Sequence, residues 1–266
     1  MQALQSMDIG AAKQLRFVLT DIDDTVTTEG RLTADAYLAL EQLSAAGITV
    51  IPITGRPAGW CDHIARMWPV FAVVGENGAF YMRYDRAARK MSTHHFANAV
   101  HLKNNRQKLD QLAHEILQQV PGSALASDQP YRLADLAIDF CEDVAPLPER
   151  AVQRIVAMFE AAGARAKISS IHVNGWFGTY DKLSMTKTLF VREFGIDLQN
   201  DNENVLFIGD SPNDEPMFEF FKYSVGVANI QRQLQRLTHR PKFVTPSEGG
   251  AGFVEMAHQL MLARKM

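Results

Sequence analysis

The sequence predicts an α/β protein in which a doubly wound parallel sheet carries a smaller, inserted α+β domain. Several short apolar runs end in polar or glycine-rich residues. Runs that are apolar at nearly every position are typical of strands buried on both faces of a parallel sheet. The middle of the chain lacks such polar tips, and its alternation of strands and helices therefore indicates a separate unit.

Five apolar segments have the length of buried strands, and each leads directly into polar or glycine-rich residues. They span residues 15–20, 48–53, 71–74, 205–208 and 223–227. Between the first two lies an expected helix, with Thr33 as its N-cap and Gly47 at its end. A strand, a helix and a second strand in this order imply a right-handed crossover and an open α/β sheet.

The middle of the chain is expected to form a unit of its own. The sequence predicts helices near residues 98–119 and 148–163, a central strand at residues 133–140 and a further strand at residues 164–173. In contrast to the outer segments, these strands do not end in carboxylate clusters. Residues 83–173 are therefore interpreted as a domain inserted into a core that is formed by residues 1–82 and 174–266.

The composition is that of an ordinary globular protein and argues against several functional classes. The 266 residues carry a net charge of −3, so we expect no nucleic-acid partner, which would need a clustered basic surface. Cys61 and Cys141 lie outside any metal-ligand spacing and are expected to be reduced thiols. No apolar run is long enough to cross a bilayer, and the N-terminal residues do not form an export signal. We therefore expect a cytoplasmic protein without a membrane partner.

Asp21 and Asp23 follow the first apolar segment directly. If the strand continues through them, their side chains share one face, because alternate residues of a strand point the same way. Two carboxylates at such a short distance repel each other unless a cation lies between them. The alternative is a turn in which the aspartates cap a helix. The position of the pair at the tip of a strand favours a functional role.

A second acidic cluster, Asp210 and Asp214, follows the strand predicted at residues 205–208. Ligands of open α/β sheets bind outside the carboxyl ends of the strands, where both clusters are expected. Four carboxylates at one sheet edge would be strongly destabilising without a hard cation that prefers oxygen ligands. Mg²⁺ fits this pattern. Ca²⁺ fits less well, because the ligand spacing of an EF-hand is absent.

Two further segments have groups that suit a phosphate. Thr54 and Gly55, followed by Arg56, offer a hydroxyl and backbone N–H groups at a strand end, which is a reasonable anion cradle. Lys182 follows Asp181, a natural N-cap, and precedes an expected helix at residues 183–194. A lysine at a helix N-terminus is electrostatically unfavourable, which suggests a functional reason for it. The alternative is an ordinary exposed lysine.

In this order, the four segments resemble the motifs of the haloacid dehalogenase superfamily of phosphohydrolases. Residues 21–25 are similar to its first motif, D-x-D-x-T, and Thr54 corresponds to the Ser/Thr of the second. Lys182 corresponds to the third-motif lysine, and residues 209–214 are similar to the fourth motif, G-D-x-x-N-D. The motifs span nearly the whole chain and are highly specific together.

The position of the insert, between the second and third motifs, resembles the Cof-like and sucrose-phosphatase-like branch of that superfamily. The segment Asn77-Gly78-Ala79 and Met217 are similar to further features of this branch. Asp24 departs from the pattern, because a glycine is common there. Lys182 is followed by Leu183-Ser184 instead of the frequent glycine, and Lys187 is a nearby competitor. Lys182 is preferred because the lysine of the family begins the helix.

The resemblance implies a Rossmann-like core with a cap domain, and a magnesium-dependent phosphatase. It implies that Asp21 is the nucleophile, which forms an aspartyl-phosphate, and that Asp23 is the general acid and base. Mg²⁺ would be bound by the Asp21 carboxylate, the Asp23 backbone carbonyl and Asp210, with support from Asp214. Phosphate oxygens would be held by Thr54, Gly55, Lys182 and Asn213.

The resemblance also implies that the cap closes over the site and selects a small phosphorylated metabolite, such as a sugar phosphate. A monomer or a homodimer is expected. A sugar phosphomutase is the nearest alternative, since it shares the aspartyl-phosphate step. A catalytically silent binding protein is the alternative from another class. His94, His95 and His172 are candidates to face the substrate, with a solvated or structural role as the other interpretation.

Overall fold

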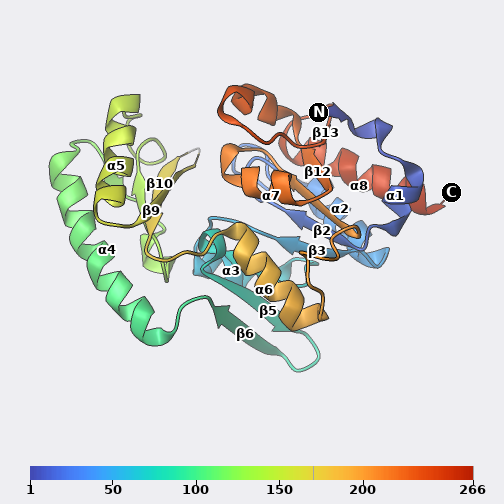
Figure 1. The fold of residues 1–266 in the computed structure, drawn as a ribbon, viewed down its shortest axis with the longest axis horizontal. Coiled ribbons are helices and arrows are strands. Elements are labelled where there is room, and N and C mark those ends of the chain that lie inside the picture. The colour runs from blue at the N-terminus through green and yellow to red at the C-terminus, as the bar shows by residue number, and fades with distance from the viewer. Residues whose placement is uncertain (170, 266) are drawn as a thin grey trace.

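The computed structural model describes residues 1–169 and 171–265 of the chain. Its fold is of the predicted class. A parallel sheet with helices on both faces lies beside a smaller unit in which helices cover an antiparallel sheet (Figure 1). Within the described residues, no helix is both long and apolar enough to cross a membrane.

The main sheet has six strands among the described residues. In spatial order they are β1 (Gln2–Ala3), β13 (Phe243–Val244), β12 (Tyr223–Gly226), β11 (Val205–Gly209), β2 (Phe17–Thr20) and β3 (Thr49–Pro52). All neighbouring pairs are parallel. The adjacent strands β2 and β11 pair from Phe17 opposite Val205 to Thr20 opposite Ile208. The segments that follow these two strands therefore leave the sheet side by side.

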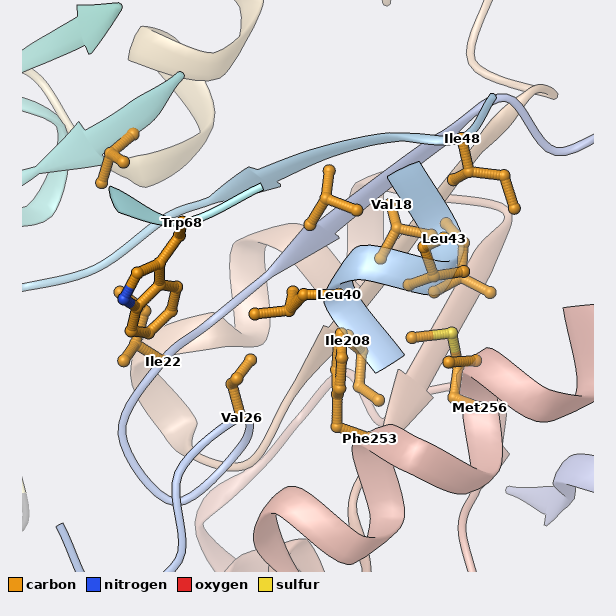
Figure 2. Close-up of a cluster of buried hydrophobic side chains, with 14 of the residues drawn as sticks. Val18, Ile22, Val26, Leu40, Leu43, Ile48, Trp68, Ile208, Phe253 and Met256 are labelled. Carbon is orange, nitrogen blue, oxygen red and sulfur yellow. The ribbon is translucent and has the colours of Figure 1, made fainter. Parts of the chain in front are cut away.

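One face of this sheet packs against helices from both ends of the chain. They are α1 (Ile9–Gln14), α2 (Ala34–Ala45), α3 (Ala58–Met67) and α8 (Gly249–Lys265). Figure 2 shows Val18 of β2 in this cluster, together with Leu40 and Leu43 of α2 and Phe253 and Met256 of α8. Each of these side chains is fully buried, which contributes about 1.5–3 kcal/mol per large apolar side chain. The N-cap of α2 is Thr33 as predicted, since its side chain accepts from the N–H of Ala36.

The other face of the sheet packs against α6 (Lys182–Phe194) and α7 (Glu215–Phe220). Phe17 and Leu19 point to this face, because residues that alternate along β2 point to opposite sides. They pack with Leu189 and Phe190 of α6 in a second buried cluster. The apolar runs of the sequence are thus buried on both faces, as a doubly wound sheet requires.

The apolar run at residues 71–74, predicted as a further strand of the parallel sheet, meets that prediction in part, since Val74 forms a parallel bridge with Ile53 just beyond β3. It forms β4 (Val73–Gly75), which pairs antiparallel with β5 (Phe80–Asp85), and β5 pairs with β6 (Lys90–His95). A bridge between Ile53 and Val74 links β4 to the end of the main sheet. The chain reverses direction directly after β4, where Glu76 and Asn77 have φ angles of 44° and 55°. This tight reversal folds β5 back onto β4.

The smaller unit, called the cap unit below, comprises residues 99–176. Its antiparallel sheet has the order β7 (Ala124–Leu125), β8 (Leu136–Asp139), β10 (His172–Trp176) and β9 (Arg165–Ile168). The predicted helices near residues 98–119 and 148–163 are confirmed as α4 (Ala99–Gln119) and α5 (Glu149–Ala161). Both helices pack on one face of the sheet around Ile116, Ile155 and Phe159. The other face carries Lys167, His172 and Asn174, called the polar cap face below, which line a cavity together with residues of the core.

The prediction of one strand at residues 164–173 is wrong. The chain reverses between Ile168 and His172, where the N–H of Ser169 donates to the carbonyl of His172, so that β9 and β10 pair antiparallel. The expected domain boundaries also fall inside strands: position 83 lies in β5, and position 174 lies in β10. A unit of whole strands would lie between the end of β6 at His95 and the end of β10 at Trp176. That it is an independent domain stays a prediction.

Candidate active site

Asp21 and Asp210 lie at the carboxyl ends of adjacent parallel strands. Asp21 directly follows β2, and its N–H donates to the carbonyl of Ile208 at 2.9 Å, which extends the ladder beyond the strand. Asp210 directly follows β11. The structure therefore brings together two carboxylates that are 189 positions apart in sequence, because parallel pairing aligns the ends of their strands.

Asp214 is fully buried at the end of a short 3₁₀ helix, η4 (Pro212–Asp214). Its Oδ2 accepts from the N–H groups of Asp210 at 3.2 Å and Ser211 at 3.4 Å. This approach explains Gly209, since a Cβ on that residue would lie 2.5 Å from Oδ2 of Asp214. The glycine of the fourth segment therefore makes room for the carboxylate that follows it.

Lys182 joins the acidic groups. Its Nζ donates to Oδ1 of Asp21 and to Oδ1 of Asp214, both at 2.7 Å. The helix α6 begins at Lys182, and Asp181 caps it by accepting from the N–H of Ser184. Lys187 lies elsewhere and donates to Oε1 of Gln199. Of the two lysines, the structure thus places Lys182 at the sheet edge.

The segment Asn77-Gly78-Ala79 packs against the start of α6. Gly78 has a φ of 106°, and a Cβ there would overlap the carbonyl group of Asp181. Only glycine tolerates both this backbone conformation and this close approach. The segment therefore helps to set the position of Lys182.

The acidic cluster has more negative charge than Lys182 can balance. Carboxylate oxygens of Asp21, Asp210 and Asp214 lie within 4.8 Å of one another. Among residues 1–169 and 171–265, Lys182 is the cation that forms ion pairs with Asp21 and Asp214. Burial of the side chain, followed by the charges of Asp214 and Asp23, raises the pKa of Asp21 to about 7. Burial and the neighbouring Asp21 raise the pKa of Asp210 well above its usual value.

These donors fit a hard divalent cation. All the clustered donors are carboxylate oxygens, and the cluster lacks the positive charge that its full ionisation needs. Asp21 and Asp210 are the residues that could hold Mg²⁺, because Asp214 already accepts from Lys182 and from two backbone N–H groups. Asp23 is predicted to bind the cation through its backbone carbonyl, and its carboxylate is not part of the cluster of side chains.

Asp23 forms an ion pair with Arg56 instead. Nε of Arg56 donates to both carboxylate oxygens at 3.0 Å, and its second terminal nitrogen donates to Oδ1 at 2.7 Å. The carboxylate is 35% exposed, whereas Asp21 is almost completely buried. The two aspartates of the first segment thus have different environments, one in the acidic cluster and one at an arginine.

The remaining predicted residues surround this cluster. Thr54 is fully buried, and its Oγ1 accepts from the N–H of Arg56 at 3.0 Å. Oδ1 of Asn213 accepts from Ser211 at 2.7 Å and from Nζ of Lys182 at 3.5 Å. Gly55 and Asn213 line the cavity described next. Thr54 does not hydrogen-bond to the clustered carboxylates within the described part of the chain.

A cavity of about 230 Å³ opens onto these groups. Its core side includes Asp21, Asp23 and Asp210, and its other side is formed by the cap unit. Residues of the polar cap face that line it include Lys167 of β9 and His172 and Asn174 of β10. The site is therefore shared between the main sheet and the cap unit.

Some residues at the site were not predicted. Asn229, after β12, donates through Nδ2 to Oδ2 of Asp210 and to the backbone carbonyl of Asp24, both at 3.0 Å. Its place after an apolar strand was the available signal. Arg56 was visible beside Thr54, yet its pairing with Asp23 was not. Arg132 of the cap unit also lines the cavity, and no sequence pattern indicates it.

The raised pKa values predict how stability changes with pH in protein stripped of metal. A carboxyl with a raised pKa keeps its proton in the folded state at a pH where the unfolded chain has lost it. For Asp21 the free energy of unfolding then falls as the pH rises from about 4 to about 7, and for Asp210 it falls as the pH rises above the ordinary aspartate pKa. Asp210→Asn removes one such group, so we expect the variant to gain stability relative to wild type as the pH rises.

Thermal unfolding of both proteins in a chelator, at about pH 5 and pH 7.5, measures this difference. The expected result is a larger advantage of Asp210→Asn at the higher pH. An equal difference at both pH values would show that Asp210 is not perturbed as described.

Comparisons with known proteins support the resemblance that the four sequence motifs indicate. The model of the haloacid dehalogenase-like hydrolase family matches residues 146–255. A protein from Thermoplasma acidophilum has a TM-score of 0.72 and 18% identity, over 93% of this chain and 99% of its own. A protein described as a HAD/COF-like hydrolase from Plasmodium vivax has a TM-score of 0.66 and 17% identity, over 96% and 99%. A trehalose-6-phosphate phosphatase related protein has a TM-score of 0.61 and 13% identity, over 94% and 97%. No curated protein matches the chain at a significant level.

At these identities the solved structures show a shared fold, and the family model adds a likeness in sequence. The matched residues 146–255 include Lys182, Asp210 and Asp214. The resemblance carried by the four motifs is thus confirmed: residues 146–255 match the haloacid dehalogenase-like hydrolase family, and the fold is shared with solved structures described as hydrolases of that kind.

Proposed function

We propose that the chain is a magnesium-dependent phosphatase that acts on a small phosphomonoester through an aspartyl-phosphate at Asp21. One observation carries the proposal. Asp21 is buried at a strand end beside Lys182 and Asp210, while Asp23, two residues further on, lies at the same cavity in a separate environment. A nucleophile and an acid/base group need this separation, because one attacks as a carboxylate while the other exchanges a proton. Burial raises the pKa of Asp21, whereas Lys182 lowers it, and a bound cation would favour the ionised form further.

The reaction consists of two displacements at phosphorus. First, a carboxylate oxygen of Asp21 forms a bond to phosphorus as the bond to the leaving oxygen breaks, and Asp23 donates a proton to that oxygen. Then Asp23 takes a proton from water, the water oxygen attacks phosphorus, and the bond to Asp21 breaks. Inorganic phosphate leaves, and both aspartates return to their first state.

The surrounding groups stabilise the charge on the phosphoryl oxygens. Nζ of Lys182 is 2.7 Å from Asp21 and would also meet an oxygen of the bound phosphate. Thr54, the backbone N–H of Gly55 and the amide of Asn213 are proposed as further donors. Mg²⁺, held by Asp21, Asp210 and the Asp23 carbonyl with Asp214 in support, would neutralise charge on the phosphate. Arg56 orients the Asp23 carboxylate at the cavity.

The polar face of the cap unit supports a sugar phosphate as substrate. Asn174 and Lys167 are paired across β10 and β9, and His172 lies two residues before Asn174 on the same face. Together they offer an amide, an ammonium and an imidazole, groups that bind hydroxyls. The likeness to a trehalose-6-phosphate phosphatase related protein agrees with this class. The cytoplasmic location and a monomer or homodimer stay predictions.

Release of inorganic phosphate tests the proposal. Purified protein is incubated with p-nitrophenyl phosphate and with a panel of sugar phosphates, with added Mg²⁺ or with a chelator. We expect phosphate release that depends on Mg²⁺, and we expect Asp210→Asn to lose most of the response to Mg²⁺. Equal release in the chelator would contradict the metal site. Isomerised sugar phosphate without free phosphate would identify a mutase, and no reaction with any member would favour a silent binding protein.

A further inference from the structure

A buried carboxylate ties the cap unit to the core beside the site. Glu76, directly after β4, is fully buried and accepts from the N–H of Ala58 at the start of α3 at 3.0 Å. It also accepts from the N–H groups of Leu133 at 2.8 Å, Ala134 at 2.6 Å and Asp135 at 3.2 Å. One side chain thus satisfies three consecutive backbone donors of the cap unit and one of the core.

Arg132, which directly precedes Leu133, is the second part of this connection between the cap unit and the core. Its side chain is 2% exposed. Nε and one terminal nitrogen donate to the two oxygens of Asp128 at 2.9 and 3.0 Å. The other terminal nitrogen donates to Asp135 at 3.0 Å and to the backbone carbonyl of Gly55 at 3.1 Å. Asn174 of β10 donates to Asp135 at 3.0 Å, so the cap sheet also holds this group.

The Gly55 carbonyl belongs to the turn that carries two proposed functional groups. The turn contains Thr54, a proposed phosphate donor, and Arg56, whose guanidinium holds the Asp23 carboxylate. The turn also contacts Glu76, because the N–H of Glu76 donates to the carbonyl of Arg56 at 3.1 Å. The left-handed backbone of Glu76, with a φ of 44°, costs on the order of 1–3 kcal/mol and is maintained by these contacts.

Stability alone does not account for this arrangement. Burying an arginine among carboxylates carries a large desolvation penalty, and such groups often contribute no more to stability than apolar residues of the same size. A planar guanidinium with several fixed donors is, however, well suited to hold a carbonyl and two carboxylates in one geometry. In this protein the guanidinium of Arg132 holds the backbone carbonyl of Gly55, the residue before Arg56.

We propose that Arg132 is a positioning residue. Through the Gly55 carbonyl it holds the turn of residues 54–56, and through Arg56 it holds Asp23 in place for proton transfer to the leaving oxygen. The cap unit therefore contributes to the acid/base geometry of the core, in addition to any contact with substrate. The inference rests on the proposed phosphatase function.

The dependence of the rate on the leaving group tests this role. The value of kcat/KM reports the first displacement, in which the leaving oxygen needs a proton only if it is basic. Phenol, with a pKa of about 10 like the tyrosine side chain, needs the acid more than the more acidic p-nitrophenol. We expect Arg132→Lys to lower kcat/KM for phenyl phosphate about 10- to 100-fold. For p-nitrophenyl phosphate the loss should be several times smaller.

Arg106 provides a matched control in the same unit. It lies on α4 and donates to the backbone carbonyl of Asp135 at 2.8 Å and to Asp110, and it has no hydrogen bond to Gly55. Arg106→Lys should leave kcat/KM for both substrates nearly unchanged. An equal loss for both substrates in Arg132→Lys, or the same pattern in Arg106→Lys, would overturn the positioning role. Failure of wild type to hydrolyse either substrate would instead refute the proposed function.

A double-mutant cycle with Arg56→Lys separates positioning from general loosening of the fold. If Arg132 acts through Arg56, the two substitutions share one effect, and the loss in the double variant should be much smaller than the product of the single losses. Multiplicative losses would contradict the proposal. Should Arg132→Lys fail to fold, as thermal unfolding would show, Asp128→Asn replaces it, because it releases one side of the guanidinium and should give a smaller loss with the same leaving-group pattern.

Discussion

Asp21→Asn is expected to abolish phosphate release, with a loss of about 10⁴-fold or more in kcat. The amide has nearly the shape of the carboxylate but lacks the anionic oxygen that forms the bond to phosphorus. The fold should tolerate the change, because Asp21 is one of three clustered carboxylates and burial raises its pKa to about 7. A neutral group at this position removes repulsion, while Lys182 keeps its partner Asp214.

The measurement is steady-state hydrolysis of p-nitrophenyl phosphate in Mg²⁺, with thermal unfolding of the same preparation to show that the protein is folded. Asp62→Asn serves as the control, since Asp62 forms a partly exposed ion pair with Arg66 on α3, away from the acidic cluster. It should keep wild-type activity. Magnesium-dependent hydrolysis that persists in Asp21→Asn would contradict the assignment of the nucleophile.

Lys182→Ala is expected to reduce both activity and stability. In the reaction it removes a cation 2.7 Å from the nucleophile, and loss of such a group from the transition state costs about 10²–10³-fold in kcat. In the fold it leaves Asp21 and Asp214 buried without their partner, and breaking a buried pair costs about 3–5 kcal/mol. Burial alone would lower the pKa of Lys182, but these two carboxylates raise it above its usual value.

Kinetics and denaturant unfolding of Lys182→Ala are compared with those of Lys187→Ala. Lys187 lies one turn further along α6, donates to Gln199 and packs over the ring of Phe220. Lys187→Ala should therefore change the rate of hydrolysis little. The reverse outcome, with a larger loss of activity in Lys187→Ala, would show that the wrong lysine has been placed at the phosphate.

The core of the site could be predicted from sequence because local signals determine it. The apolar runs before Asp21 and Asp210 define strands, and parallel pairing then brings their ends together without knowledge of distant contacts. Lys182 was singled out because it follows Asp181, a local capping signal for α6, and the family resemblance favoured it over Lys187. These residues depend on short segments whose patterns are complete within a few positions.

The connection between the cap unit and the core could not be predicted in this way. Glu76 binds backbone groups 57 to 59 positions away, and Arg132 contacts Gly55 across 77 positions. Neither residue belongs to a periodic pattern. The reversal after β4 was not predicted either, because it depends on the left-handed backbone of Glu76 and Asn77, and the distant contacts of Glu76 maintain that conformation. Strand β8 begins at Leu136, after the residues that Glu76 binds, whereas the sequence predicted a strand at residues 133–140.

A covalent phosphoryl group on Asp21 is the central claim, and trapping it is the most direct measurement. In Asp23→Asn the first displacement from p-nitrophenyl phosphate should survive, because p-nitrophenol leaves without a general acid. The second should be slow, because water lacks its base. Acid quenching, borohydride reduction of the acyl phosphate and mass spectrometry of the peptides then locate the modified residue. The account predicts close to one phosphoryl group per chain, at Asp21, and modification of a different residue, or turnover without any covalent species, would contradict it.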